Sequence, residues 1–169
     1  MNDVDILKKI EKKVLWLACW MIHNANHIRE NQDGLKVGGH QASSASIVSI
    51  MTALYFNILR PEDRVAVKPH ASPVFHAIQY LSGLQTKEKI ENFRGFGGAQ
   101  SYPSRTKDID DVDISTGSVG LGVAMTSFIS LIQDYVARKK FYKNKPLGRM
   151  IALVVDEELD EGNVYECLQ

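Results

Sequence analysis

The stretch Gly148–Gln169, GRMIALVVDEELDEGNVYECLQ, joins an apolar run to a cluster of acids and then to a second apolar pattern. The apolar run, Arg149–Asp156, is rich in aliphatic and β-branched residues and predicts a buried strand. The segment Glu161–Gln169 predicts the start of a helix. The acids at the carboxyl end of the strand are Asp156, Glu157, Glu158, Asp160 and Glu161. Ligands of parallel α/β sheets bind beyond this end of the strands, so the cluster is a candidate site.

Strand and helix signals alternate through the rest of the chain. The β-branched segment Asp63–Pro69 predicts a second strand. The predicted helices share helical apolar spacing or a capped start, and they are Asp3–Glu30, Ser43–Leu59, His70–Gly83, Thr86–Arg94 and Thr116–Lys140. The serines that open Ser43–Leu59 are expected to cap a largely buried helix. The alternation predicts an α/β fold in which helices flank a parallel sheet.

The composition favours one domain covering residues 1–169, with an amino-terminal helix within residues 1–33. Hydrophobic residues make up 44% of the 169, which is enough for a core. The 20 basic and 20 acidic residues cancel, which argues against nucleic acid or an anionic membrane as a partner. We expect no signal peptide, and the run VLWLACWMI is too short to cross a bilayer. Cys19 and Cys167 are expected to be buried, reduced thiols of a cytoplasmic protein.

A glycine-rich turn precedes the longest predicted helix of the second half. Gly117, Ser118, Val119 and Gly120 form the turn, and Gly122 follows it. Glycines let a backbone approach a ligand closely, and the N–H groups at a helix start suit a phosphate. Tight packing between the helix and the strand before it explains the same glycines, so the motif alone leaves both interpretations open.

Asp156 has two interpretations of its own. A carboxylate at the end of a buried strand is a good magnesium ligand when phosphate oxygens complete the shell. The same residue is also a common helix cap. Asp160 and Glu161 are explained by the dipole of the helix that follows them.

The histidines fall into two groups. His40 and His70 each lie in a loop before a helix that starts with small residues, where they could bind an anion, move a proton or bond a carbonyl. His23 and His27 are one helical turn apart, which is the spacing of metal ligands. The sequence supplies no third ligand beside them, so we expect no zinc site there.

Four longer motifs occur in one order: GGHQASSAS, KPHASPVFHAIQYL, FGGAQSYPSRTKDIDDVDISTGSVGLG and IALVVDEELDEGN. Together they resemble the diphosphate-binding part of thiamine-diphosphate enzymes of the transketolase and pyruvate dehydrogenase type. The likeness is closest to the decarboxylating component of homodimeric pyruvate dehydrogenases and runs from about Gly38 to the end. It implies an incomplete diphosphate-binding domain of the thiamine-diphosphate-binding fold. It also implies that the loop Ser101–Asp113 lies near an active-site entrance.

The resemblance assigns roles by position. It implies that His40 and His70 line the cofactor and substrate pocket as catalytic residues. It implies that the turn Gly117–Gly120 covers the diphosphate and that Asp156 binds Mg²⁺, with Glu157 beside the cofactor. In this family a carbanion of the cofactor attacks a ketone or a 2-oxo acid, and a carbon–carbon bond is then cleaved.

The sequence departs from the family pattern at the strand end. Val155 stands where the family has a glycine, and Glu157 adds a negative charge near the expected phosphates. The asparagine that completes the magnesium shell, and the second domain with its activating glutamate, are not in the sequence. We therefore expect this chain alone to bind thiamine diphosphate and Mg²⁺ weakly and to be inactive.

Two classes of function follow. The first is the amino-terminal part of a pyruvate dehydrogenase-like enzyme acting on a 2-oxo acid, with transketolase-like ketol transfer as an alternative. The second is a non-catalytic remnant or interaction module of the same fold. Both imply a partner, which is either the missing carboxyl-terminal domains or another chain, in a homodimer or a hetero-oligomer.

Overall fold

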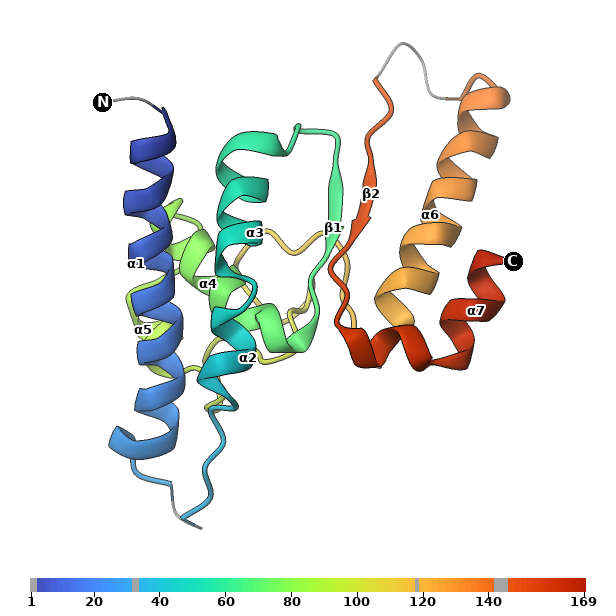
Figure 1. The fold of residues 1–169 in the computed structure, drawn as a ribbon. Coiled ribbons are helices and arrows are strands. Elements are labelled where there is room, and N and C mark those ends of the chain that lie inside the picture. Colours follow the sequence, from blue (N-terminus) through green and yellow to red (C-terminus); the bar gives the residue numbers. More distant parts are fainter. Residues whose placement is uncertain (1–2, 32–33, 118, 142–145) are drawn as a thin grey trace. The chain divides into compact units, whose positions relative to one another are not determined.

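A computed structural model of the chain describes residues 3–31, 34–117, 119–141 and 146–169 (Figure 1). It divides into two compact units. Unit 1 comprises Met1–Leu59 and Pro69–Val112, and unit 2 comprises Arg60–Lys68 and Asp113–Gln169. Unit 1 holds helices, and unit 2 holds a sheet with helices. The prediction of one domain over residues 1–169 stays a prediction.

Unit 1 is built around helix α1 (Asp3–His23), which continues as a π-helical turn η1 (Asn24–Ile28). Val14, Ala18 and Met21 of α1 are fully buried, and their spacing places them on one face of the helix. That face packs against α4 (Ser72–Leu81), whose residues from Ser72 to Gln79 are all buried. The buried face of α1 and the buried helix α4 therefore form the core of this unit.

The segment predicted as one helix over Ser43–Leu59 is three shorter elements. They are α2 (Gln41–Ala45), α3 (Val48–Ala53) and a π-helical turn η2 (Leu54–Ile58). The predicted serine cap is wrong, because His40 occupies the capping position and no side chain caps α2. The Ser46 hydroxyl donates to the carbonyl of Ser43 at 2.8 Å where α2 ends, and such local bonds compete with a continuous helix. The expected burial is also incomplete, since Ile50 is 60% exposed.

Two short elements complete unit 1. A 3-10 turn η3 (Pro69–Ala71) leads into α4, and α5 (Lys87–Glu91) follows it. Thr86 caps α5 by accepting the N–H of Lys89 at 3.3 Å.

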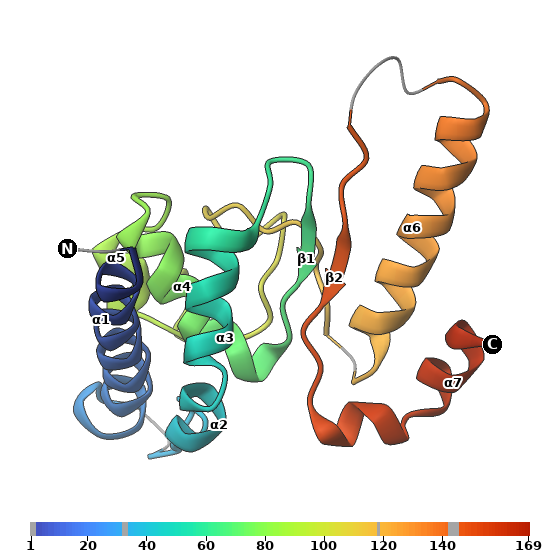
Figure 2. The ribbon, with the colours of Figure 1, turned by 45° about the horizontal axis from the view of Figure 1, so that its top comes forward.

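Unit 2 contains two parallel strands, β1 (Arg64–Ala66) and β2 (Met150–Ala152). Val65 pairs with Ile151, and Ile114 extends the sheet through a bridge to Ala66. Helix α6 (Leu121–Arg138) packs on both strands, a 3-10 turn η4 (Asp156–Asp160) follows β2, and α7 (Gly162–Leu168) packs on α6. Figure 2 shows β1 beside β2. The predicted α/β fold with a parallel sheet is confirmed, with strands shorter than the sequence suggested.

Asp63 fixes the beginning of both strands. One carboxylate oxygen accepts the backbone N–H of Arg149 at 2.7 Å, and the other accepts that of Arg60 at 2.9 Å. The Arg149 guanidinium donates to the same carboxylate, with its Nη2 2.5 Å from Oδ2. Hydrogen bonds from the Arg149 side chain hold the pKa of Asp63 well below its usual range, and those from backbone N–H groups add to this.

The two cysteines are free thiols, as expected, but both are only half-buried. The expectation of full burial is therefore wrong for Cys19 and Cys167. No helix of the described residues is both long enough and apolar enough to cross a membrane.

Candidate functional site

His40 and His70 line one hollow in unit 1, with a volume of about 320 Å³. His40 precedes α2 and His70 lies in η3, so each is presented by the start of a helical segment. Lys36 and Arg94 also line the hollow, and none of the described acidic residues does. Four basic side chains without a carboxylate among them favour an anionic ligand.

Tight backbone contacts shape the wall of this hollow before His40. The Asn26 side chain accepts the N–H of Gly38 at 2.6 Å and donates to the carbonyl of Gly39 at 3.0 Å. A side chain at Gly38 would meet the carbonyl oxygen of Ile22 at 2.5 Å, so only glycine fits. The segment that carries His40 is therefore held rigidly against the end of α1.

Arg94 is a site residue that the sequence analysis missed. Its backbone is left-handed, with φ of 61°, which is uncommon for a residue other than glycine. Its guanidinium donates to the carbonyl of Val37 at 2.5 Å, and partial burial lowers its pKa. The motif NFRG around it carries no chemical signature, so only the folded chain shows that Arg94 reaches the hollow of His40 and His70.

In unit 2 the glycine turn lies against η4. Gly120 begins α6 with φ of 77°, and its N–H donates to the Glu158 carboxylate at 3.4 Å. A side chain at Gly120 would meet the Asn163 amide oxygen at 2.4 Å. Gly117 and Val119 are exposed, and Ser118 lies outside the described residues.

Asp156 is exposed at the first position of η4, after the segment 153–155 that follows β2, so the predicted strand ends earlier than Asp156. The capping position belongs to Val155, which is extended with φ of −103° and ψ of 165°. Any residue adopts this conformation, so valine in place of glycine strains nothing here. Of Glu157 the structure describes the backbone in η4 and not the side chain.

Glu158 is the buried acid of this region, and the sequence analysis gave it no role. Its carboxylate accepts the N–H of Val155 at 2.9 Å as well as that of Gly120. Lys68, which is buried at the end of β1, lies 3.5 Å from the same carboxylate. A carboxylate of the chain itself therefore bonds an N–H group that the resemblance assigns to the diphosphate turn.

Replacing Glu158 with glutamine is expected to destabilise the chain by about 2 kcal/mol, because the buried ammonium of Lys68 then loses the carboxylate that lies 3.5 Å from it. Urea unfolding at neutral pH measures this loss. Glu161→Gln, at an exposed position, is the matched control and should change the free energy of unfolding by less than about 0.5 kcal/mol. Equal effects of the two variants would contradict a role for the buried pair.

A second titratable cluster lies inside unit 1. The His76 ring contacts Asp110 through Nδ1 at 2.6 Å and the carbonyl of Gln100 through Nε2 at 2.7 Å, and it is fully buried. Among the described residues, His76, Asp108 and Asp110 form the one group of three ligands that could hold a metal. Because both ring nitrogens are already hydrogen-bonded, we interpret the cluster as structural.

His23 and His27 do not belong to that group. The centroids of their rings lie 5.0 Å apart, with an angle of 38° between the ring planes. The structure places no third ligand with them among the residues it describes.

The chain was compared with known proteins. No family model matches it. It is 30% identical over 171 residues to the pyruvate dehydrogenase E1 component of Mycobacterium tuberculosis and 26% identical to that of Mycolicibacterium smegmatis. Each match covers 95% of this chain and 18% of the relative. Transketolase-like protein 2 of Mus musculus is 29% identical over 141 residues, covering 77% of this chain and 21% of that protein.

The chain thus spans about a fifth of the length of the curated relatives that it matches. The matches confirm the resemblance drawn from the four motifs. This chain is a relative of the pyruvate dehydrogenase E1 components and transketolase-like proteins, and corresponds to a limited part of them.

Proposed function

We propose that the chain is the amino-terminal part of a thiamine-diphosphate-dependent enzyme of the pyruvate dehydrogenase type, acting on a 2-oxo acid. The observation that carries this proposal is the hollow of unit 1, where His40 and His70 meet Lys36 and Arg94. A 2-oxo acid is a small anion with an adjacent carbonyl group. It therefore needs cationic partners for its carboxylate and hydrogen-bond donors for its carbonyl oxygen, and this hollow offers both.

The residues of the hollow divide these tasks by their chemistry. The Arg94 guanidinium has a planar fork of donors that matches a carboxylate. Its bond to the carbonyl of Val37 uses one nitrogen and fixes the direction of the side chain. His40 and His70 can donate from a ring nitrogen or hold a proton there. Together these side chains would bind and orient a 2-oxo acid.

The cofactor implied by the relatives would supply the carbanion that attacks the substrate carbonyl. The described residues of unit 2 do not make a diphosphate site by themselves. Gly120 already donates to Glu158, and Asp156 is the one carboxylate placed as a magnesium ligand by the resemblance. We therefore expect this chain alone to bind thiamine diphosphate weakly and to leave pyruvate unchanged.

The proposal includes a second polypeptide that covers an exposed apolar face of α6. Helix α6 exposes large apolar side chains at helical spacing: Phe128, Leu131, Ile132 and Tyr135. An apolar stripe of this kind is typical of a face that another polypeptide covers. The partner is either the rest of the enzyme or a second chain in a dimer, and the assembly is proposed to be cytoplasmic.

Two alternatives rest on specific observations. The transketolase-like relative favours ketol transfer, for which the same basic hollow would take a sugar phosphate. The bond from Gly120 to Glu158 favours a non-catalytic interaction module, because the chain's own carboxylate accepts the Gly120 N–H.

Titration of the ¹⁵N-labelled chain with pyruvate tests the proposed function. We expect saturable shifts at the backbone signals of His40, His70 and Arg94, with a dissociation constant on the order of 1 mM. Arg94→Gln should weaken binding about tenfold, because it removes the charge opposite the carboxylate. Arg138→Gln, at an exposed position of α6, is the control and should change nothing.

The same titration with fructose 6-phosphate separates the two enzyme hypotheses. Tighter binding of the sugar phosphate than of pyruvate would favour ketol transfer. Saturable binding of neither anion would contradict both and leave the interaction module.

A further inference from the structure

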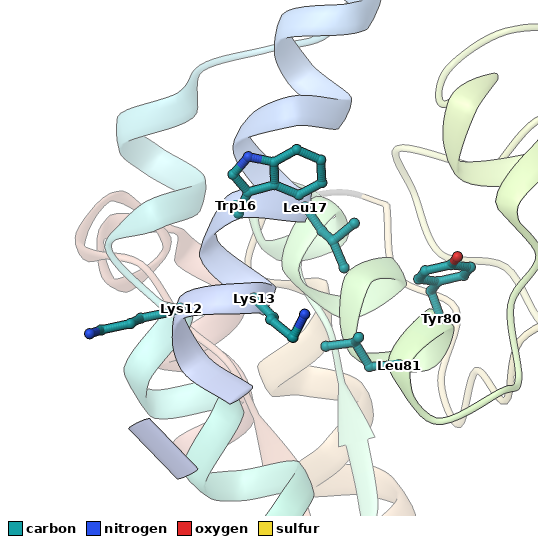
Figure 3. A pocket seen from close by; sticks show the side chains of 6 residues that line it. All are labelled: Lys12, Lys13, Trp16, Leu17, Tyr80 and Leu81. Carbon is teal, nitrogen blue, oxygen red and sulfur yellow. The ribbon is translucent and has the colours of Figure 1, made fainter. Parts of the chain in front are cut away.

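A second hollow of unit 1 lies between α1 and α4, apart from the one that holds His40 and His70. It has a volume of about 310 Å³ and is lined by Lys12, Lys13, Trp16, Leu17, Tyr80 and Leu81 (Figure 3). A volume near 300 Å³ is at the lower end of the range for small-molecule sites. The two helices that form its walls are in direct contact, so the hollow is part of one folded unit.

The walls of this hollow expose an unusual amount of aromatic surface. Trp16 is 63% exposed, although tryptophan is highly buried on average. Its ring stacks on that of Trp20, with centroids 6.3 Å apart and an angle of 16° between the planes. The neighbouring ring restricts the indole, so a flat apolar surface is held ready for a planar partner.

The charges at the hollow are all positive. Lys12 and Lys13 line it, and none of the described Asp or Glu residues does. In Figure 3 the Lys13 side chain points to the side of Leu17 and Leu81, whereas Lys12 points away from them. Within the described part of the chain, no ion pair or side-chain hydrogen bond involves Lys13, so its ammonium is available to an anion.

The size of the hollow decides between a peptide and a small molecule. Lys12 and Leu17 are one and a half turns apart, so the lined part of α1 is only about 7.5 Å long. A docked amphipathic helix uses anchors at i, i+3 or i+4 and i+7, which span about 10.5 Å. A fused two-ring aromatic molecule matches the shorter length.

We propose that this hollow binds a small aromatic carboxylate, independently of the proposed enzyme function. The aromatic rings lie against Trp16, Leu17 and Leu81, and the carboxylate pairs with the Lys13 ammonium. The apolar walls supply contact area, and the single cation selects an anion over a neutral molecule of the same shape.

The test uses 2-naphthoate as the probe and 2-naphthalenemethanol as its neutral match, titrated into the full chain by calorimetry. We expect 2-naphthoate to bind with a dissociation constant on the order of 0.1–1 mM, and the neutral probe about fivefold more weakly. Lys13→Met should reduce 2-naphthoate binding to the level of the neutral probe. Lys8→Met, at an exposed position of α1 outside the hollow, is the matched control and should leave binding within about twofold. Thermal unfolding establishes that both variants keep the fold.

The indole N–H signals of the ¹⁵N-labelled chain in NMR spectra show where 2-naphthoate binds, because the chain has only two tryptophans. Trp16→Phe identifies the signal of Trp16 by its loss, and that signal should shift on addition of 2-naphthoate. Equal binding of the two probes, equal weakening by Lys8→Met and Lys13→Met, or shifts confined to residues outside the hollow would each overturn the proposal. A negative result with 2-naphthoate would not count against the proposed enzyme function, which the pyruvate titration tests, since the lining residues of the two hollows differ.

Discussion

Replacing Asp63 with alanine is expected to lower the free energy of unfolding by about 3 kcal/mol. The Asp63 side chain is fully buried and accepts backbone N–H groups from both Arg60 and Arg149, together with the Arg149 guanidinium. Its loss removes the shared acceptor of these donors at the point where β1 and β2 begin. Urea unfolding at neutral pH measures the effect, and Glu166→Ala on the exposed face of α7 is the control.

The contribution of Asp63 should depend on pH in a defined direction. Its pKa in the folded chain is below the unfolded value, mainly because the Arg149 side chain donates to the carboxylate. The stabilisation is therefore fully present above about pH 5, which is about one unit above the unfolded pKa, and is lost as the pH falls toward the folded pKa. The difference in unfolding free energy between the wild type and D63N should shrink between about pH 5 and about pH 2.5. A difference that is constant over this range would contradict the assignment.

Removing the Asp110 carboxylate should have an effect of similar or greater size. Asp110→Ala is expected to destabilise the chain by about 3–5 kcal/mol, because His76 is fully buried and loses its partner at 2.6 Å. Hydrogen exchange in the loop Ser101–Asp113 should increase as well, since Asp110 ties this loop to α4. Asp111→Ala, at the exposed neighbour, should stay within about 0.5 kcal/mol of the wild type.

A double-mutant cycle isolates the contact between the two side chains. The combination of His76→Phe with Asp110→Leu removes both partners and replaces them with apolar groups, which is often far less costly than removing one. The double variant should therefore be more stable than the sum of the single changes predicts, by about 2 kcal/mol. Strict additivity would show that the contact contributes nothing beyond burial.

Helices with a clear apolar period were predictable from the sequence, and less regular ones were not. α1 follows the period because one of its faces is packed against α4, which is itself buried from Ser72 to Gln79. The segment Ser43–Leu59 is also rich in apolar residues but breaks into three elements, and the Ser46 hydroxyl bonds the backbone locally where the first of them ends. A hydropathy pattern does not report such competition for hydrogen bonds.

For the site, the sequence identified residues but not their neighbours. His40 and His70 were recognised from their motifs, and the structure places both at one hollow of unit 1. Arg94, which lines the same hollow, has no motif of its own. In unit 2 the sequence drew attention to Glu157, while the buried Glu158 makes the contacts to Gly120 and Lys68.

The sequence by itself determined the parallel α/β class, the glycine-turn start of α6 and the resemblance to the pyruvate dehydrogenase and transketolase proteins. These features depend on local pattern and on motifs within short segments. Only the tertiary structure decided which charges are paired. Asp63 and Arg149 are 86 positions apart, and His76 and Asp110 are 34 apart. The energy of such pairs depends on burial and distance in the folded chain, and neither quantity is encoded in the spacing of the residues along the sequence.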